Sequence, residues 1–111
     1  MPEEHVPPLA AVLREMTAVS DVRTTLPPEF VVAVRFAALV ALDAGRDSYL
    51  SLLRAAAEQG LVLDDAQQVL VVLAPLLGTE RTSSASAKVA EAVRLLRAVR
   101  DANDEQNADD G

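Results

Sequence analysis

Residues 64–78 read DDAQQVLVVLAPLLG, and this stretch decides the fold class of the chain. Its middle, Val69–Leu73, is rich in valine and taken alone is typical of a buried strand. The ends indicate a helix instead, because Asp64 is a candidate N-cap with Gln67 at the capping-box distance. Gly78 is a candidate C-terminal stop. Since the segment is long, capped at both ends and has no second β-type run nearby to pair with, it predicts a helix.

The rest of the chain has the same helical character. It contains 20 Ala and 16 Leu, both strong helix formers, and no Ile. Prolines and glycines separate the periodic segments. Besides residues 65–77, the predicted helices cover residues 9–19, 29–44, 47–59 and a last segment from 83 or 84 to about 100. We therefore expect a single all-α, five-helix domain over residues 9–100, preceded by an extended, proline-rich arm at residues 1–8.

Acidic residues are concentrated at the C-terminus. The chain has 17 acidic and 10 basic residues, a net charge of −7, and residues 101–111 hold five of the acidic ones with no base. This segment has almost no apolar side chain, so we expect a disordered acidic tail. The remaining 100 residues are close to neutral, and no basic face is concentrated in them. A nucleic-acid partner is therefore not expected.

Several classes of site and location are excluded or disfavoured by composition. The chain has no Cys, which excludes disulfides, zinc fingers and cysteine nucleophiles. No metal-ligand spacing or phosphate-binding loop occurs, so no metal and no cofactor are expected. The longest apolar run, residues 69–77, is far shorter than the ~20 residues that span a bilayer. The N-terminus has no export signal, and we expect a cytoplasmic protein without a membrane partner.

Two helices are more apolar than a small monomer can bury. Between Phe30 and Leu42 the only charged residue is Arg35, and residues 69–77 contain no polar side chain. A helix that is apolar on all sides is buried on all sides. Five short helices can enclose one such helix but hardly two. We therefore expect self-association into a homo-oligomer.

The order of these segments resembles the carboxymuconolactone decarboxylase family, which includes the alkylhydroperoxidase-like (AhpD-like) proteins. The resemblance rests on LPPEFVVAVRFAALVALDAG at 26–45, AAAEQG at 55–60, VLVVLAPLLG at 69–78 and the Ala-rich closing helix. It covers residues 26–93. The resemblance implies an AhpD-like helical bundle that assembles into trimers or hexamers.

The redox centre that this resemblance implies is absent. The CxxC positions fall on Gly45 and Ser48, the His position on Leu52 and the proton-relay Glu near Ala33. None of these side chains can form a thiolate or move a proton as the chemistry requires. Peroxidase and disulfide-reductase activity are therefore excluded. The lactone-decarboxylase branch needs no cysteines, but its acidic position in the fourth helix aligns with Ala66.

Three residues are weak candidates for a site. Tyr49 adjoins the former redox positions and could offer its hydroxyl to a ligand, although a buried ring with a hydrogen-bonded hydroxyl is the alternative. Arg46 lies with Asp43 and Asp47 around the turn at residue 45, where they could line a pocket or cap helix ends. Glu80 lies in the turn after residue 78, where relatives contribute to the site. A surface ion pair with the following arginine is the alternative.

Other polar residues have simpler interpretations. His5 lies in the N-terminal arm and is a general base only if that arm folds over a pocket. Arg94, Arg97 and Arg100 form a stripe that could bind a carboxylate or phosphate. The alternative is that they interact with the dipole at the C-terminal end of the last helix, beside the acidic tail.

Two functions follow from these observations. The first is a family member without a redox centre, an oligomeric protein that works by binding or assembly. The alternative is an enzyme of the decarboxylase or lactone type acting on a small organic acid, with a carboxylate ligand held between subunits. The first is favoured because no titratable group occupies the positions where a catalytic one is needed.

Overall fold

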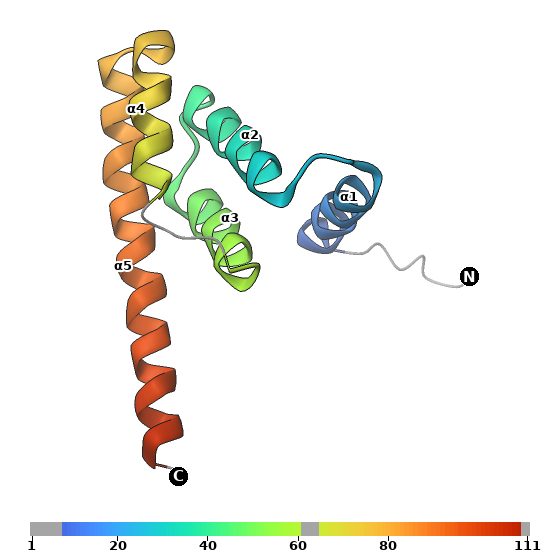
Figure 1. The fold of residues 1–111 in the computed structure, drawn as a ribbon, viewed down its shortest axis with the longest axis vertical. Helices are drawn as coiled ribbons and strands as arrows, with labels where there is room; N and C mark the ends of the chain where they lie inside the picture. Colours follow the sequence, from blue (N-terminus) through green and yellow to red (C-terminus); the bar gives the residue numbers. More distant parts are fainter. Residues whose placement is uncertain (1–7, 61–64, 110–111) are drawn as a thin grey trace, which may run out of the picture.

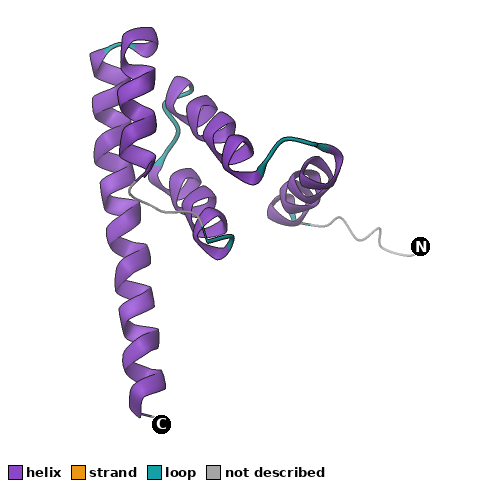
Figure 2. Ribbon diagram, viewed as in Figure 1, coloured by secondary structure: helices purple, strands orange, loops and turns teal. Residues whose placement is uncertain are grey.

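The computed structural model describes residues 8–60 and 65–109, and every regular element in these ranges is a helix (Figures 1 and 2). The all-α prediction is confirmed for the described residues. The five helices are α1 (Leu9–Arg23), α2 (Pro28–Ala41), α3 (Arg46–Glu58), α4 (Asp65–Leu77) and α5 (Thr79–Asp109). Most of the N-terminal arm, including His5, and the predicted cap Asp64 lie outside the described residues.

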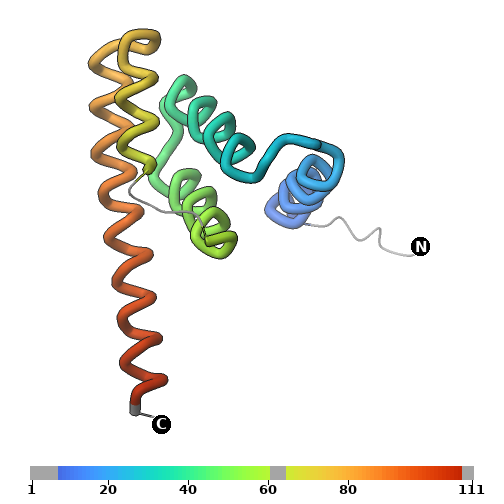
Figure 3. Tube along the Cα trace, in the orientation of Figure 1, coloured from blue at the N-terminus to red at the C-terminus, as the bar shows by residue number. Residues whose placement is uncertain are grey.

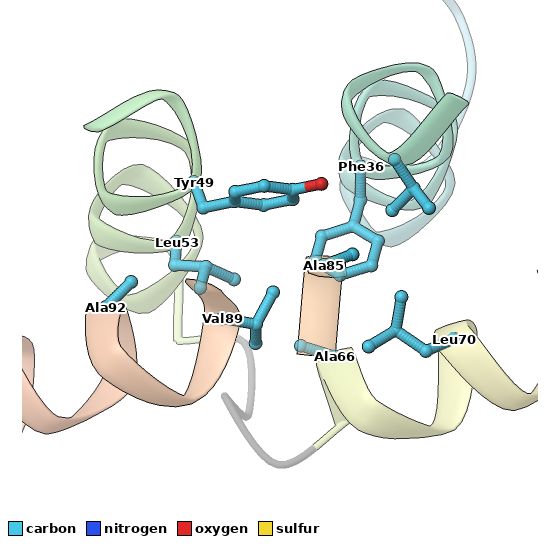
Figure 4. Close-up of a cluster of buried hydrophobic side chains, with 9 residues drawn as sticks. Phe36, Tyr49, Leu53, Ala66, Leu70, Ala85, Val89 and Ala92 are labelled. Atoms are coloured by element: carbon cyan, nitrogen blue, oxygen red, sulfur yellow. The ribbon is translucent and has the colours of Figure 1, made fainter. Parts of the chain in front are cut away.

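Helices α2 to α5 form the packed body of the protein. Helices α3 and α4 both lie against α5, and α2 contacts all three. Each of these helices contributes the side that faces the others, and the core combines two aromatic rings with aliphatic side chains (Figure 4). The buried residues of this core are Phe36, Val40, Tyr49, Leu53, Ala66, Leu70, Ala85, Val89 and Ala92.

Two turns differ from the sequence-based prediction. Helix α2 ends at Ala41, three residues early, because Asp43 takes a left-handed conformation with φ of 51° and reverses the chain. Helix α5 begins at Thr79 instead of residue 83 or 84. The positive φ of Gly78, 87°, turns the chain in a single residue, so α5 starts at once and runs back beside α4 (Figure 1).

Helix α1 stands apart from this body (Figure 3). Arg35 of α2 donates hydrogen bonds to Asp21 and Ser20 near the end of α1, but the backbone of α1 lies close to no other described helix and none of its residues is buried. The predicted single domain over residues 9–100 is therefore packed only from α2 onward. The radius of gyration, 16.7 Å, reflects this open shape, since a compact chain of this length has one of about 13 Å.

The C-terminal segment also differs from the prediction. Residues 101–109, expected to be disordered, continue α5 as a helix to Asp109. The packed first half of α5 has already nucleated the helix, and extending it through Ala, Glu and Gln residues needs no new nucleus. Although α5 is 31 residues long, neither it nor any other described helix is apolar enough over a sufficient length to cross a membrane.

Candidate functional site

Polar side chains of α5 hold the turn between α2 and α3. Arg81, Ser84, Lys88 and Glu91 follow one another at intervals of three and four residues, which places them on one face of the helix. We call these four residues the α5 clasp. Its first member, Arg81, donates a hydrogen bond from Nη1 to the backbone carbonyl of Ala41 at the end of α2.

Asp43 is the centre of the contacts in this turn. Its Oδ1 accepts hydrogen bonds from Ser84 Oγ at 2.9 Å and from Lys88 Nζ at 3.1 Å. Lys88 Nζ also donates to the carbonyl oxygen of Ala44 at 2.8 Å. The hydrogen bond from Lys88, followed by that from Ser84, lowers the pKa of the Asp43 carboxyl. Asp43 thus ties the turn to α5 and does not cap a helix, which was the simpler sequence-based interpretation.

Arg46 begins α3 and is likewise paired with α5. Its Nη1 donates to Glu91 Oε1 at 2.9 Å, and its Nε and Nη2 lie 3.4 Å from Asp47 Oδ1. The hydrogen bond to Glu91 raises the pKa of Arg46 further above its already high ordinary value. The guanidinium is therefore committed to two carboxylates of the same chain.

A shallow depression of about 440 Å³ opens at this turn. It is lined by Gly45, Arg46, Asp47, Ser48, Lys88 and Glu91. The two cations and the two carboxylates balance one another in charge. Both cations already donate to carboxylates. Arg46 donates to Glu91 and Asp47, and Lys88 donates to Asp43. An anionic ligand entering here would have to displace these internal ion pairs.

Tyr49 lies inside the core. The side chain is fully buried, and its ring meets the edge of the Phe36 ring with centroids 5.7 Å apart and planes at 64° (Figure 4). The hydroxyl points toward α2 and has no hydrogen-bond partner among the described residues. Burial, with a smaller contribution from the Asp43 carboxylate, raises the pKa of Tyr49. The predicted buried ring is confirmed, but the expected hydrogen bond of its hydroxyl is not present.

Tyr49→Phe is expected to stabilise the protein by about 1 kcal/mol. A buried donor without a partner carries a desolvation penalty that phenylalanine does not have, while the ring packing against Phe36 is kept. Urea unfolding followed by circular dichroism measures the change. Tyr49→Leu is the matched control and should lose stability because it removes the ring. A loss of stability in Tyr49→Phe would show that the hydroxyl has a partner.

The ionisation of Tyr49 limits the pH up to which the folded protein is stable. The pKa of Tyr49 is raised above its ordinary 10.0 in the folded chain. The free energy of unfolding that depends on the neutral hydroxyl is therefore fully present below pH 10 and is lost as pH rises through the folded pKa. Tyr49 is the only tyrosine, so tyrosinate absorbance reports it alone. We expect ionisation above pH 10 to coincide with unfolding, and Tyr49→Phe to remove this part of the alkaline transition.

The three candidate residues do not meet at one site. Arg46 pairs with Glu91, and Tyr49 is buried in the core. Glu80 lies in the first turn of α5, eleven residues before Glu91. At 1.5 Å per residue this separation is about 16 Å along the helix. The neighbouring Arg81 binds the carbonyl of Ala41, so it is committed to the turn between α2 and α3.

The positions that correspond to the redox centre in the family resemblance have ordinary structural surroundings. Gly45 and Ser48 lie at the depression. Leu52 packs against the edge of the core, and Ala33 is partly buried on α2. Ala66, at the position where the resemblance implies an acidic residue, is a buried core residue of α4.

The arginine stripe of α5 is not at a helix end. Arg94, Arg97 and Arg100 are exposed, and α5 continues nine residues beyond Arg100. Interaction with the C-terminal end of the helix dipole, which falls off within the last turn, therefore does not account for them. The Nε atom of Arg100 lies 4.0 Å from Oδ1 of Asp101 in an exposed ion pair.

Sequence reasoning missed three members of the α5 clasp: Ser84, Lys88 and Glu91. Their spacing, together with Arg81, was a readable signal, because four polar residues on one face of an Ala-rich helix indicate a polar contact. Their partners lie 41–45 residues earlier in the chain, and no local pattern identifies them.

Comparisons with protein-family models, with curated proteins and with solved structures each returned no match. The conclusions about function therefore rest on the residues and their geometry.

Proposed function

We propose that this protein is a subunit of a homo-oligomer and works by binding or assembly, without a catalytic centre. The observation that carries the proposal is helix α1, which is apolar along one side and yet has no buried residue. Monomeric proteins rarely leave such contiguous apolar surfaces uncovered, and larger ones mark interaction sites.

The outer sides of two other helices support the same proposal. Helix α2 exposes Phe30 and Val34, and α4 exposes Val71, Val72 and Leu76, each of them by more than half of its surface. These are the two helices whose sequences are apolar on all sides. Within one chain, each buries only the side that faces the core. A neighbouring subunit would cover the remainder.

The resemblance to the carboxymuconolactone decarboxylase family remains part of this proposal. It rests on the sequence motifs at 26–45, 55–60 and 69–78. An AhpD-like bundle would assemble as a trimer or hexamer.

The alternative, an enzyme acting on a small organic acid, is disfavoured by the charges at the depression. Arg46 and Lys88, the cations that a carboxylate would need, are paired with Glu91, Asp47 and Asp43. Thermal-shift measurements against small carboxylates and lactones, up to millimolar concentration, test this alternative. A clear rise in melting temperature would favour it.

Native mass spectrometry and light scattering across a dilution series test the main proposal. We expect a trimer or a hexamer that dissociates only on strong dilution. A species with the mass of a single chain at every concentration would contradict it.

A further inference from the structure

The C-terminal half of α5 projects beyond the packed body. Leu96 is the last described residue of α5 that packs against the core, and every residue from Arg97 to Ala108 is exposed. Figure 1 shows this part of the helix, in red, extending past α3 and α4. The exposed stretch is about 18 Å long, so more than three turns of α5 lie outside the body.

The charges of this half of α5 fall into two adjoining blocks of opposite sign. Residues 94–100 contain three bases and no acid, and residues 101–105 contain three acids and no base. The basic block is Arg94, Arg97 and Arg100, and the acidic block is Asp101, Asp104 and Glu105. In each of the other described helices, no three successive charged residues have the same sign. This separation of charge is therefore particular to α5.

The outermost charges of the two blocks are poorly compensated within the helix. Glu105 has no basic residue within four positions on either side, and Asp101, one turn earlier, repels it. The last turn of α5 also contains no base, although the helix dipole favours cations there. Arg94 follows Glu91 by three residues, but the Glu91 carboxylate accepts a hydrogen bond from Arg46 Nη1 at 2.9 Å. A partner of opposite charge would stabilise this end of the helix.

An apolar seam runs along the same half of α5. Leu95, Val99 and Ala102 recur at intervals of four and three residues, so they lie on one side of the helix. Leu95 is 39% and Val99 60% exposed, and Ala102 is also exposed. We call these three residues the α5 seam. Arg94 and Glu105 are eleven residues apart, which is about three turns, so both lie along the same edge of the seam.

We propose that the C-terminal halves of α5 from two copies of this chain pair antiparallel through the α5 seam. A two-fold axis near the boundary between the blocks brings Arg94 of each copy beside Glu105 of the other. A parallel pair would instead place each block against its own copy, and such like-charge contacts are unfavourable. Because no other described helix has two such blocks, α5 of a second copy is the described segment whose charge order complements this one.

This inference rests on the proposed function and deepens it, because it assigns one contact that joins the subunits. A two-fold contact uses the same surface on both subunits. It therefore gives an even number of subunits: a dimer when it acts alone, or a hexamer when a three-fold contact is also present.

Charge reversal in the full chain tests the pairing. In Arg94→Glu and in Glu105→Arg, each pair of helices contains two like-charge contacts, so the dissociation constant should rise about tenfold or more. The double variant Arg94→Glu/Glu105→Arg restores opposite charges and should regain the wild-type value. Residues 94 and 105 are about 16 Å apart along one helix, so this rescue cannot arise within a single chain. Sedimentation velocity over a dilution series measures the constants.

A matched control and a mixing experiment complete the test. Arg54→Glu makes the same change of charge at an exposed position of α3 and should leave the dissociation constant unchanged. Arg94→Glu and Glu105→Arg are complementary to each other when they are mixed. By native mass spectrometry, each variant alone should give smaller species, and the mixture should regain the wild-type oligomer mass. Circular dichroism verifies that all variants keep the wild-type helix content.

The remaining outcomes separate this inference from the proposed function. If both reversals weaken assembly but neither the double variant nor the mixture restores it, α5 does not pair with α5 in this register and the inference is overturned. If the wild-type protein is a trimer, or an oligomer that neither reversal affects, only the inference fails. If the wild-type protein is a monomer at every concentration, both the inference and the proposed function fail.

Discussion

Phe36→Ala is expected to remove about 3–5 kcal/mol of stability, the usual effect of emptying a buried aromatic site. Phe36 is 2% exposed. It is the larger of the two buried residues of α2, and its ring packs in an edge-type contact with that of Tyr49. Domains of this kind have only about 5–15 kcal/mol of stability in total, so the variant should be partly unfolded at 37 °C or close to it. Urea unfolding by circular dichroism measures the loss.

Phe30→Ala is the matched control, since it removes the same side chain from the same helix. Phe30 is 58% exposed, so its loss should change the stability of the single chain by less than about 1 kcal/mol. Under the proposed assembly, however, Phe30 is part of the interface. Its effect should therefore grow with protein concentration, whereas the effect of Phe36→Ala should be present even at high dilution. Equal losses in both variants at high dilution would contradict the assignment of Phe36 to the core and Phe30 to the surface.

Leu13→Glu is expected to dissociate the oligomer without unfolding the chain. The residue lies on the exposed apolar side of α1 with Leu9, Met16 and Val19 and is not buried within its own chain, so the body of α2 to α5 does not depend on it. At an apolar interface, an unpaired carboxylate carries a penalty of several kcal/mol. Since every 1.4 kcal/mol is a factor of ten, the dissociation constant should rise at least about a hundredfold. Sedimentation or light scattering over a dilution series measures this change.

Arg14→Glu is the control for Leu13→Glu. This substitution changes the net charge by more than Leu13→Glu does, but Arg14 lies on the polar side of α1, away from Leu9, Leu13 and Met16. We expect its oligomeric state and its melting temperature at high dilution to match the wild type. Dissociation by Arg14→Glu to the same extent would show that net charge, and not the apolar side of α1, governs assembly.

Local sequence patterns predicted only part of the candidate site. The sequence identified the turn around Gly45 as polar and named Arg46 as its main cation. It did not show that Glu91 neutralises Arg46, because that partner lies 45 residues away along the chain. For Tyr49, burial of the ring was predictable from its place on the apolar side of an amphipathic helix. The missing partner of the hydroxyl was not, since it depends on which atoms of α2 lie opposite.

The sequence by itself determined the helical class, the approximate extent of most helices and the excess of apolar surface. These depend on interactions within about four residues, such as backbone hydrogen bonds and turn residues, and composition reports them directly. Only the tertiary structure decided which side of α2 and α4 is buried, that α1 stays outside the body, and that the α5 clasp neutralises the polar turn. The tertiary structure also decided that α5 continues to Asp109. A helix that packing has nucleated extends through residues that composition alone assigns to a disordered tail. Each of these features depends on contacts between residues far apart in the chain, which no local periodicity encodes.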